Sequence, residues 1–410
     1  MRQSLCLRCV SVLSLGLAAG CMSLRDLPTE RELYGRSFDN VPAELARMEV
    51  RFEAHSRSSG KIVEHTVETA YWDNSSLGRA VRVAAADEQP ALLVVLVHGI
   101  FQNKRVWRQV AAHPFMADTL AEANLFVPDL AGFGWSSDPQ DVAWNHYDPS
   151  TGTGYSLIEV QVEFLYAAIN AWINRHDPGT RVHRVLVVGH SLGGAMAIRM
   201  ADRRPEIASL AGRVQLAGLM LVNPYIGTDE TPEALKLMRK ASQEAIPLNT
   251  RLLGIVEDAW VREMSQAVHR ISSKDPRPMV PREFVASMLE QWYARDLATI
   301  RNMIGLDVPA VDPRVASMPE EYNADFLGLM RSLSRREDLP VFMIMGTHDE
   351  MMPKPLHEVA AARLNLYERE TQDNQTYVYV FRCGHHTPVE RPEELAQVIR
   401  RAARQLGGKN

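Results

Sequence analysis

The sequence predicts an α/β fold in which a mostly parallel, doubly wound sheet carries an inserted helical cap. Short apolar runs alternate with segments of helical periodicity, and this alternation is typical of parallel sheets with right-handed crossovers. The run at residues 91–97 is continuously apolar, as expected of a strand covered on both faces. Residues 228–338 show no strand pattern, and so long an interval between strands predicts the cap.

The strands and helices of the core follow from these local patterns. Two β-like runs, 62–67 and 80–84, lie between Gly and Ser turns and predict an antiparallel entry to the sheet. A helix is expected over 116–123, and a capping box formed by Ser156 and Glu159 predicts another helix directly after it. The further strands are expected at 91–97, 125–127, 185–188, 219–222, 341–345 and 376–381.

The predicted domain order places the cap inside one core. Residues 51–227 and 339–410 are the two parts of the core, and residues 228–338 are the insertion between them. Thr231, Pro232 and Glu233 are typical of a capped helix start, which supports a helical insertion. We expect the cap to lie over the carboxyl ends of the strands, where open α/β sheets bind ligands.

The first twenty residues have the pattern of a secretion signal. Arg2 and Arg8 precede an apolar stretch that is too short to span a bilayer, which needs roughly twenty residues. Residues 17–21 resemble the bacterial lipobox, so we expect cleavage before Cys21, acylation of that cysteine and a tether over 21–50. This would place the protein in the bacterial cell envelope, at the periplasmic side of a membrane or the cell surface. The alternative is an ordinary signal peptide with an incidental cysteine and a soluble product.

Cysteine positions and charge limit the other classes of function. Cys6 and Cys9 lie inside the predicted signal, which leaves Cys383 as the only free thiol after acylation of Cys21, so no disulfide framework is expected. The removed segment has two basic and no acidic residues, and the formal charge therefore moves from -5 to -7 (-5 - 2). No block of Lys and Arg provides the concentrated basic surface that phosphate binding needs, which argues against a nucleic-acid partner.

Ser191 is the candidate nucleophile, because it stands at the centre of Gly189-His190-Ser191-Leu192-Gly193. An apolar, strand-like run precedes this segment, and small and apolar residues follow it as a potential buried helix. A nucleophile on a sharp strand-to-helix turn needs glycines two residues before and after it, since a Cβ atom there would collide.

His385 is the candidate base, because a serine hydroxyl is a poor nucleophile at neutral pH without a group whose pKa lies near 6.5. It follows the strand-like run at 376–381, and His386 is the alternative. Asp349 lies just past the run at 341–345 and is expected to orient the base, with Glu350 as the alternative.

The remaining parts of the candidate site are backbone groups and one structural histidine. The N–H groups of Leu192 and Ile100 are expected to bind an oxyanion, with Phe101 as the alternative to Ile100. His98 is expected to hold its loop in place and not to transfer protons. Asn223, which follows the strand run at 219–222, cannot supply a charge. No metal or cofactor is implied.

Several motifs, in this order, resemble the α/β-hydrolase superfamily and specifically its capped single-domain branch. The motifs are His98-Gly99, Asp129-x-x-Gly132-x-Gly134-x-Ser136, Gly189-His190-Ser191-Leu192-Gly193-Gly194, Asp349, and Gly384-His385 with Glu390 and Pro392. The resemblance covers roughly residues 91–406 and implies the α/β-hydrolase fold, in which the triad follows the chain order Ser, Asp, His. A serine at position 191 departs from the haloalkane dehalogenases and epoxide hydrolases, which use an aspartate there.

Together with the lipobox-like residues 17–21, which depart from the family pattern, the resemblance leads us to expect a lipid-anchored serine hydrolase that cleaves a carboxylic ester through an acyl-enzyme. The substrate would be a small-molecule or lipid ester, and an acylated Cys21 would hold the protein at the membrane. Cleavage of a thioester, an amide or a carbon-carbon bond by the same triad is an alternative. A catalytically silent binding or scaffold lipoprotein of the envelope is the alternative from another class. Nothing in the sequence predicts an oligomeric state.

Overall fold

A computed structural model gives the fold of the core. The predicted signal peptide, Cys21 and the predicted cap, apart from Leu333, lie outside the described residues. The sheet begins at Ala46, inside the segment for which the sequence predicted a tether. The structure describes residues 46–83, 90–99, 102–137, 139, 141–143, 146–148, 153–155, 157–202, 213–225, 333, 339–347, 349 and 377–407.

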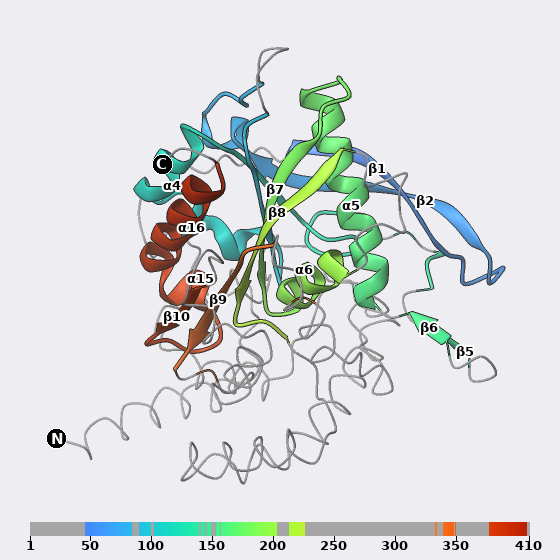
Figure 1. The fold of residues 1–410 in the computed structure, drawn as a ribbon. Coiled ribbons are helices and arrows are strands. Elements are labelled where there is room, and N and C mark those ends of the chain that lie inside the picture. Colours follow the sequence, from blue (N-terminus) through green and yellow to red (C-terminus); the bar gives the residue numbers. More distant parts are fainter. Residues whose placement is uncertain are drawn as a thin grey trace, which may run out of the picture.

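An eight-stranded sheet forms the centre of the described part of the chain, in the order β1-β2-β4-β3-β7-β8-β9-β10 (Figure 1). The strands from β4 to β10 in this order run parallel, whereas β2 pairs antiparallel with both β1 and β4. The mostly parallel sheet with an antiparallel entry is therefore confirmed. The strands are β1 (Ala46–His55), β2 (Ile62–Asp73), β3 (Leu93–Val97), β4 (Asn124–Pro128), β7 (His183–His190), β8 (Val214–Val222), β9 (Val341–Gly346) and β10 (Tyr377–Phe381).

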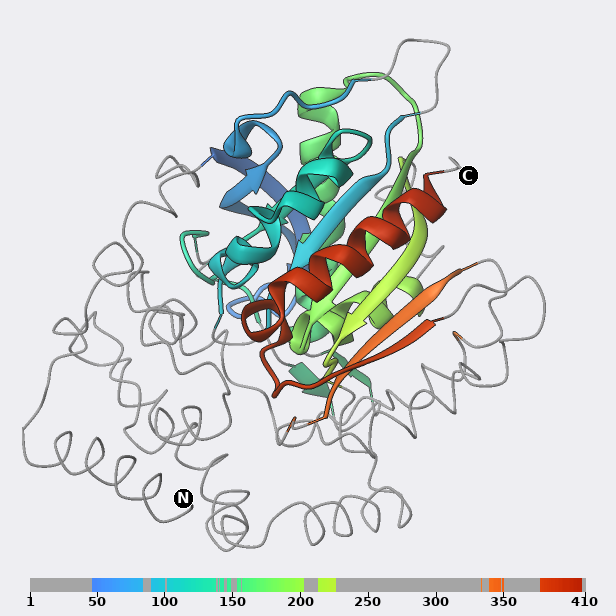
Figure 2. The same ribbon diagram turned by 90° about the vertical axis from the view of Figure 1, so that its left-hand side faces the viewer.

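Helices cover both faces of the sheet, which explains why its central strands are apolar throughout. Successive residues of one strand enter opposite cores: Val187 of β7 packs with the core that includes Phe164, and Leu186 packs with the core that includes Ile399. Figures 1 and 2 show the two helical layers on either side of the sheet. One layer holds α5 (Leu157–His176) and α6 (Leu192–Asp202), and the other holds α4 (Pro114–Leu120) and α16 (Pro392–Leu406).

Shorter elements complete the described part. The predicted strand at 80–84 is wrong for Ala80 to Val83, which form no strand. The side chain of Asn124 binds the backbone of this segment instead: it accepts from the Arg82 N–H at 2.8 Å and donates to the Arg82 carbonyl at 2.9 Å. The shorter elements are η3 (Ser75–Leu77), η4 (Lys104–Trp107), α3 (Arg108–Ala111), α15 (Thr387–Glu390) and a separate hairpin of β5 (His146–Asp148) and β6 (Thr153–Tyr155).

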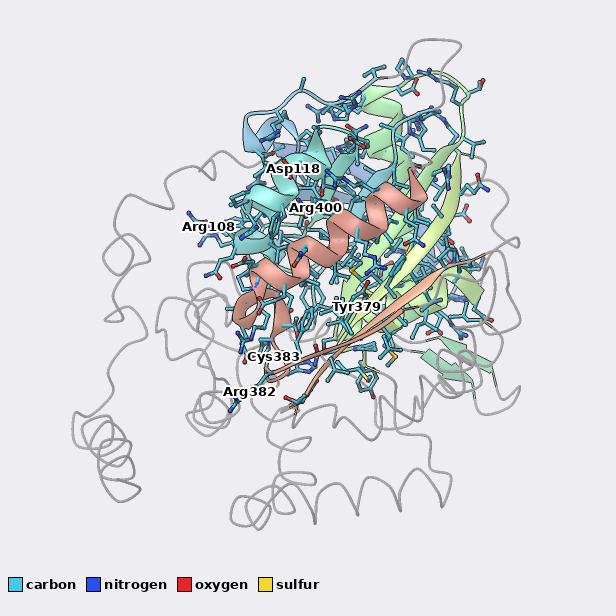
Figure 3. The ribbon with its side chains drawn as sticks, turned by 60° about the vertical axis from the view of Figure 1, so that its left-hand side comes forward. Arg108, Asp118, Tyr379, Arg382, Cys383 and Arg400 are labelled. Atoms are coloured by element: carbon cyan, nitrogen blue, oxygen red, sulfur yellow. The ribbon has the colours of Figure 1, made fainter. Side chains whose placement is uncertain are left out.

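The contact between α16 and α4 is held mainly by apolar packing. Arg400 of α16 pairs with Asp118 of α4 at 3.0 Å, and its guanidinium carbon lies 4.3 Å from the ring centroid of Phe115 (Figure 3). Because Asp118 is half exposed, this pair contributes at most about 1 kcal/mol. Leu395 and Ile399, on the inner face of α16, are fully buried, and each stabilises the fold by about 2 kcal/mol.

None of the described helices is long and apolar enough to cross a bilayer.

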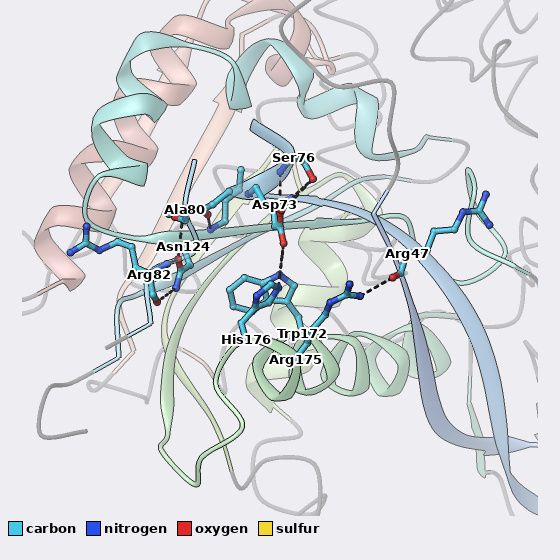
Figure 4. A network of polar contacts seen from close by, with 12 residues as sticks. Arg47, Asp73, Ser76, Ala80, Arg82, Asn124, Trp172, Arg175 and His176 are labelled. Carbon is cyan, nitrogen blue, oxygen red and sulfur yellow. Dashed lines mark hydrogen bonds and ion pairs between the residues drawn. The ribbon is translucent and has the colours of Figure 1, made fainter. Parts of the chain in front are cut away.

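Asp73 ties the end of β2 to the last turn of α5 (Figure 4). Its carboxylate accepts from the backbone N–H groups of Ser75 and Ser76 at 2.9 and 3.2 Å and from the Trp172 indole at 3.2 Å, and His176 lies 3.4 Å away. Burial by itself would raise the pKa of Asp73. The hydrogen bonds from His176, Ser75, Ser76 and Trp172 outweigh burial and hold the pKa at about 2.

Replacement of Asp73 should therefore make the fold less stable in a pH-dependent way. The pKa is lower in the folded than in the unfolded chain, so the stabilisation is present above about pH 4 and is lost as the pH falls through about 2. We expect Asp73→Asn to lower the free energy of unfolding at pH 7 by about 2 kcal/mol. Urea unfolding at pH 7, 4 and 3 measures the difference, which should shrink with falling pH. A difference that stays constant would contradict this account.

Candidate active site

Ser191 sits on a strained turn between β7 and α6. Its backbone φ is +52°, in the left-handed region that costs a non-glycine residue on the order of 1 kcal/mol. Neighbouring backbone groups hold the turn, because the Ser191 N–H donates to the Val222 carbonyl at 3.0 Å and the Ser191 carbonyl accepts from the Tyr225 N–H at 2.9 Å. The nucleophile candidate is thus fixed against the end of the neighbouring strand β8.

The glycines around Ser191 are needed for steric reasons, as the sequence predicted. A Cβ atom on Gly189 would lie 2.1 Å from the Gly193 carbonyl oxygen, and one on Gly193 would lie 2.5 Å from the Val97 carbonyl oxygen. Gly99, two residues after β3, is also tightly packed: a Cβ atom there would lie 3.0 Å from the Cβ of Ser191. The turns after β3 and β7 therefore meet where the strand order reverses, which is where α/β sheets bind ligands.

The structure brings His385 and Asp349 together. Nδ1 of His385 lies 2.9 Å from Oδ2 of Asp349, and both side chains are buried. The two residues follow β10 and β9, which are neighbouring parallel strands, so their carboxyl ends lie side by side. A proton shared with the carboxylate at Nδ1 leaves Nε2 as the nitrogen that is able to take a proton from a nucleophile.

Ser191 and His385 meet at the same edge of the sheet without a hydrogen bond between their side chains in the described part. The distance between a catalytic nucleophile and its base is often long in structures without substrate. The link between the two loops is His190, whose Nε2 lies 2.8 Å from the His385 carbonyl oxygen and whose ring centroid lies 5.0 Å from that of His385.

His386, the alternative base, lies in a different environment. Its Nδ1 accepts a hydrogen bond from Nε2 of Gln102 at 3.2 Å. Burial, and then the neighbouring rings of His385 and His190, lower the pKa of His386 well below its usual range. Glu350, the alternative acid, lies outside the described residues.

Asn223 has a role that the sequence did not predict. Its Nδ2 donates to Oδ2 of Asp349 at 2.6 Å, and its Oδ1 accepts from the Thr387 hydroxyl at 2.6 Å. Like Ser191 it has a positive φ, +43°, directly after a strand. Asn223 therefore holds the carboxylate that contacts His385. Its position after a strand of the parallel sheet was the one sequence feature that pointed to the site.

His98 and Asp129 organise the loops that flank the site. The Leu130 N–H donates to Nε2 of His98 at 3.1 Å, and Nδ1 of His98 donates to the Gly99 carbonyl at 2.8 Å. Burial lowers the pKa of His98 to about 4, so the ring is neutral near pH 7, in line with its expected structural role. Asp129 accepts from the Lys104 ammonium at 2.5 Å and from the Trp135 N–H at 3.0 Å.

One of the two expected oxyanion donors lies among the described residues. Leu192 is the first residue of α6, and N–H groups in a first helical turn have no acceptor within the helix. Ile100 and Phe101 lie outside the described residues. Burial raises the pKa of the Cys383 thiol to about 12, so it is not a competing nucleophile at neutral pH. The described residues contain no cluster of three potential metal ligands.

Comparisons with known proteins agree with this architecture. Residues 94–398 match the alpha/beta hydrolase family. Lipase LipV of Mycobacterium tuberculosis is 30% identical over 136 residues, which are 33% of this chain and 38% of LipV. An uncharacterized protein of the same organism is 23% identical over 281 residues, 67% of this chain and 65% of that protein, so the chain spans less than two thirds of both relatives.

A solved structure supports the fold alone. The peroxisomal α/β-hydrolase Lpx1 of Saccharomyces cerevisiae has a TM-score of 0.50 and 12% identity, with 89% of this chain and 90% of Lpx1 covered. The family match extends over most of the chain, from β3 to α16, and includes every strand that positions the candidate site. The chain belongs to the alpha/beta hydrolase family.

Proposed function

We propose that this protein is a serine hydrolase that cleaves the carboxylic ester of a small molecule or lipid. The observation that carries the proposal is the 2.9 Å contact between Nδ1 of His385 and Oδ2 of Asp349 at the strand ends where Ser191 occupies a strained turn. A histidine oriented by a buried carboxylate, beside a serine, is the arrangement that activates a hydroxyl for attack on a carbonyl carbon.

In the proposed reaction the Ser191 hydroxyl attacks the ester carbonyl and Nε2 of His385 takes its proton. Asp349 stabilises the imidazolium, and the N–H groups of Leu192 and Ile100 bind the oxyanion. His385 then gives the proton to the leaving alkoxide, and the alcohol departs. Water activated by His385 attacks the acyl-enzyme, and the acid is released as Ser191 is restored.

The likeness to a lipase favours an ester over the other bonds that the same triad is able to cleave. The test assays purified full-length protein against a panel of an ester, a thioester and an amide that share one acyl group. Labelling by a fluorophosphonate is measured in parallel. We expect labelling of the protein and fastest turnover of the ester. Faster turnover of the thioester or amide would change the substrate class, and a chain with neither turnover nor labelling would be a binding or scaffold protein.

We further propose that Cys21 is acylated and anchors the protein at a membrane of the bacterial envelope. The proposal rests on residues 17–21 and on the basic and apolar residues before them. More than one acyl chain on the cysteine would give stable attachment, because each buried methylene contributes about 0.8 kcal/mol.

Cys21→Ser should move the protein from the membrane fraction to the soluble fraction of a bacterial expression host without changing kcat for the ester. The fractions are compared by immunoblot, and incorporation of an alkyne fatty acid measures acylation directly. Cys9→Ser is the matched control, since it lies in the predicted signal and leaves Cys21 in place. Membrane attachment that survives loss of Cys21 would argue against the anchor.

A further inference from the structure

Gln102 is a buried glutamine whose side-chain amide touches three neighbours of the candidate site. Its Oε1 accepts from the Gly99 N–H at 2.8 Å and lies 3.0 Å from Nδ1 of His190. Its Nε2 lies 3.2 Å from Nδ1 of His386. These contacts join the segment after β3, the last residue of β7 and the loop after β10.

The orientation of the amide follows from its backbone partner. The Gly99 N–H is only able to donate, so the amide atom that faces it is the oxygen, and the NH₂ group must face His386. Nδ1 of His386 is therefore an acceptor. The neutral ring of His386 then carries its proton on Nε2.

On the side of β3, Gln102 is hydrogen-bonded to Gly99 through both its side chain and its backbone. The Gly99 N–H donates to the Gln102 side chain, and the Gln102 N–H donates back to the Gly99 carbonyl at 3.4 Å. A Cβ atom on Gly99 would lie 2.9 Å from Oε1 of Gln102 and 3.0 Å from the Cβ of Ser191. Gly99 is thus packed between the amide and the nucleophile candidate, so a shift of the amide shifts the turn relative to Ser191.

On the side of the base, Gln102 contacts the two histidines that flank His385. His190 reaches the His385 carbonyl with Nε2 at 2.8 Å, and His386 is the next residue along the chain. The ring centroid of His385 lies 5.0 Å from the ring centroid of His190 and 5.2 Å from that of His386. Burial, and then His385, lower the pKa of His190 to about 3, so its neutral ring donates to one oxygen at a time, that of Gln102 or of His385.

We propose that Gln102 is a positioning residue that holds Gly99, which packs against Ser191, and the loop of His385 in one fixed geometry. The inference rests on the proposed function. Gln102 acts through Gly99, His190 and His386, and among the described residues its side chain forms no hydrogen bond with the Ser191 hydroxyl or the His385 imidazole. A displacement of about 1 Å in such a site lowers the rate by about 100-fold, so loss of the amide should act mainly on the chemical step.

A matched control exists for the view that Gln102 only satisfies buried backbone groups. Gln161 is also buried, and its amide accepts from the Ala131 N–H at 3.2 Å and donates to the Ala131 carbonyl at 2.8 Å. It binds backbone as Gln102 does, but within the described part of the chain its amide forms no hydrogen bond with Ser191, His385 or Asp349 or with the neighbouring histidines. Replacement of either glutamine by methionine removes the amide and keeps the side-chain length.

The experiment compares kcat, KM and the thermal unfolding midpoint of wild type, Gln102→Met and Gln161→Met with a p-nitrophenyl ester. We expect Gln102→Met to lower kcat by about 10- to 100-fold with KM within about threefold, and Gln161→Met to keep kcat within about threefold. If Gln102→Met does not fold, Gln102→Asn replaces it, since its shorter amide cannot keep all three contacts. We expect Gln102→Asn to lower kcat by about tenfold or more.

Three results would overturn the inference while wild type remains active. The first is a kcat of the Gln102 variant within threefold of wild type, and the second is an equal loss of kcat in Gln161→Met. The third is a higher KM of the Gln102 variant with unchanged kcat, which would indicate a substrate contact instead. A wild-type protein that neither turns over the panel of substrates nor reacts with a fluorophosphonate would instead refute the proposed function, and the inference with it.

Discussion

Ser191→Ala is expected to lower kcat for a p-nitrophenyl ester by about 10⁴-fold or more, while the protein stays folded. Without the hydroxyl no acyl-enzyme forms, and only catalysis by the oxyanion hole and substrate binding remains. The fold should survive, because alanine keeps the Cβ atom and the backbone bonds to Val222 and Tyr225 do not involve the hydroxyl. Initial rates, with circular dichroism as the test of folding, measure the effect.

Ser76→Ala is the matched control for this prediction. Ser76 and Ser191 are both 7% exposed, but Ser76 lies beyond the end of β2, which runs antiparallel to β4 and therefore ends at the opposite edge of the sheet. Its replacement should leave kcat within about twofold. If Ser191→Ala retained more than a hundredth of the wild-type rate, the nucleophile would be another group.

His385→Ala should have an effect of similar size, about 10⁴-fold or more on kcat, because the base and the nucleophile act as one unit. His386→Ala should cost only about tenfold, through loss of the contact with Gln102. The two residues are adjacent and both buried, so the pair separates proton transfer from the effects of a cavity.

The pH profile of the same two variants gives an independent reading. We expect the His386 variant to keep the acid limb of the wild-type profile of kcat/KM, since that limb reports the base of the free enzyme. Loss of activity in the His386 variant with retention in the His385 variant would reverse the assignment of the base.

The parallel sheet was predictable because its central strands are buried on both faces and therefore appear as continuous apolar runs. The first strand, β1, was not predicted, although its sequence carries a strand pattern. In β1, buried Met48, Val50 and Phe52 alternate with exposed charged residues, and this period-2 pattern starts before Arg51, where the core was expected to begin. An antiparallel entry to the sheet was expected from the runs at 62–67 and 80–84, and the structure forms it from β1 and β2 instead.

The residues chosen for the site were predictable because Ser191, Asp349 and His385 each follow a strand of the parallel sheet within a few residues, and such strands end at one edge. Asn223 also follows a strand, β8, but neither its role nor that of Gln102 was predictable from this pattern. Asn223 contacts a carboxylate 126 positions further along the chain, and Gln102 contacts a histidine 284 positions away. A neutral amide gains a role only from the partners that the fold brings to it, and no local pattern encodes those partners.

The most direct test of the central claim is a crystal structure of the protein after reaction with a fluorophosphonate. We expect phosphorus bonded to Oγ of Ser191 and the phosphonyl oxygen within hydrogen-bond distance of the Leu192 N–H. We also expect Nε2 of His385 within hydrogen-bond distance of Ser191 Oγ while Nδ1 remains on Asp349. Phosphorus on another residue, or a His385 ring that stays out of reach of the modified serine, would contradict the central claim.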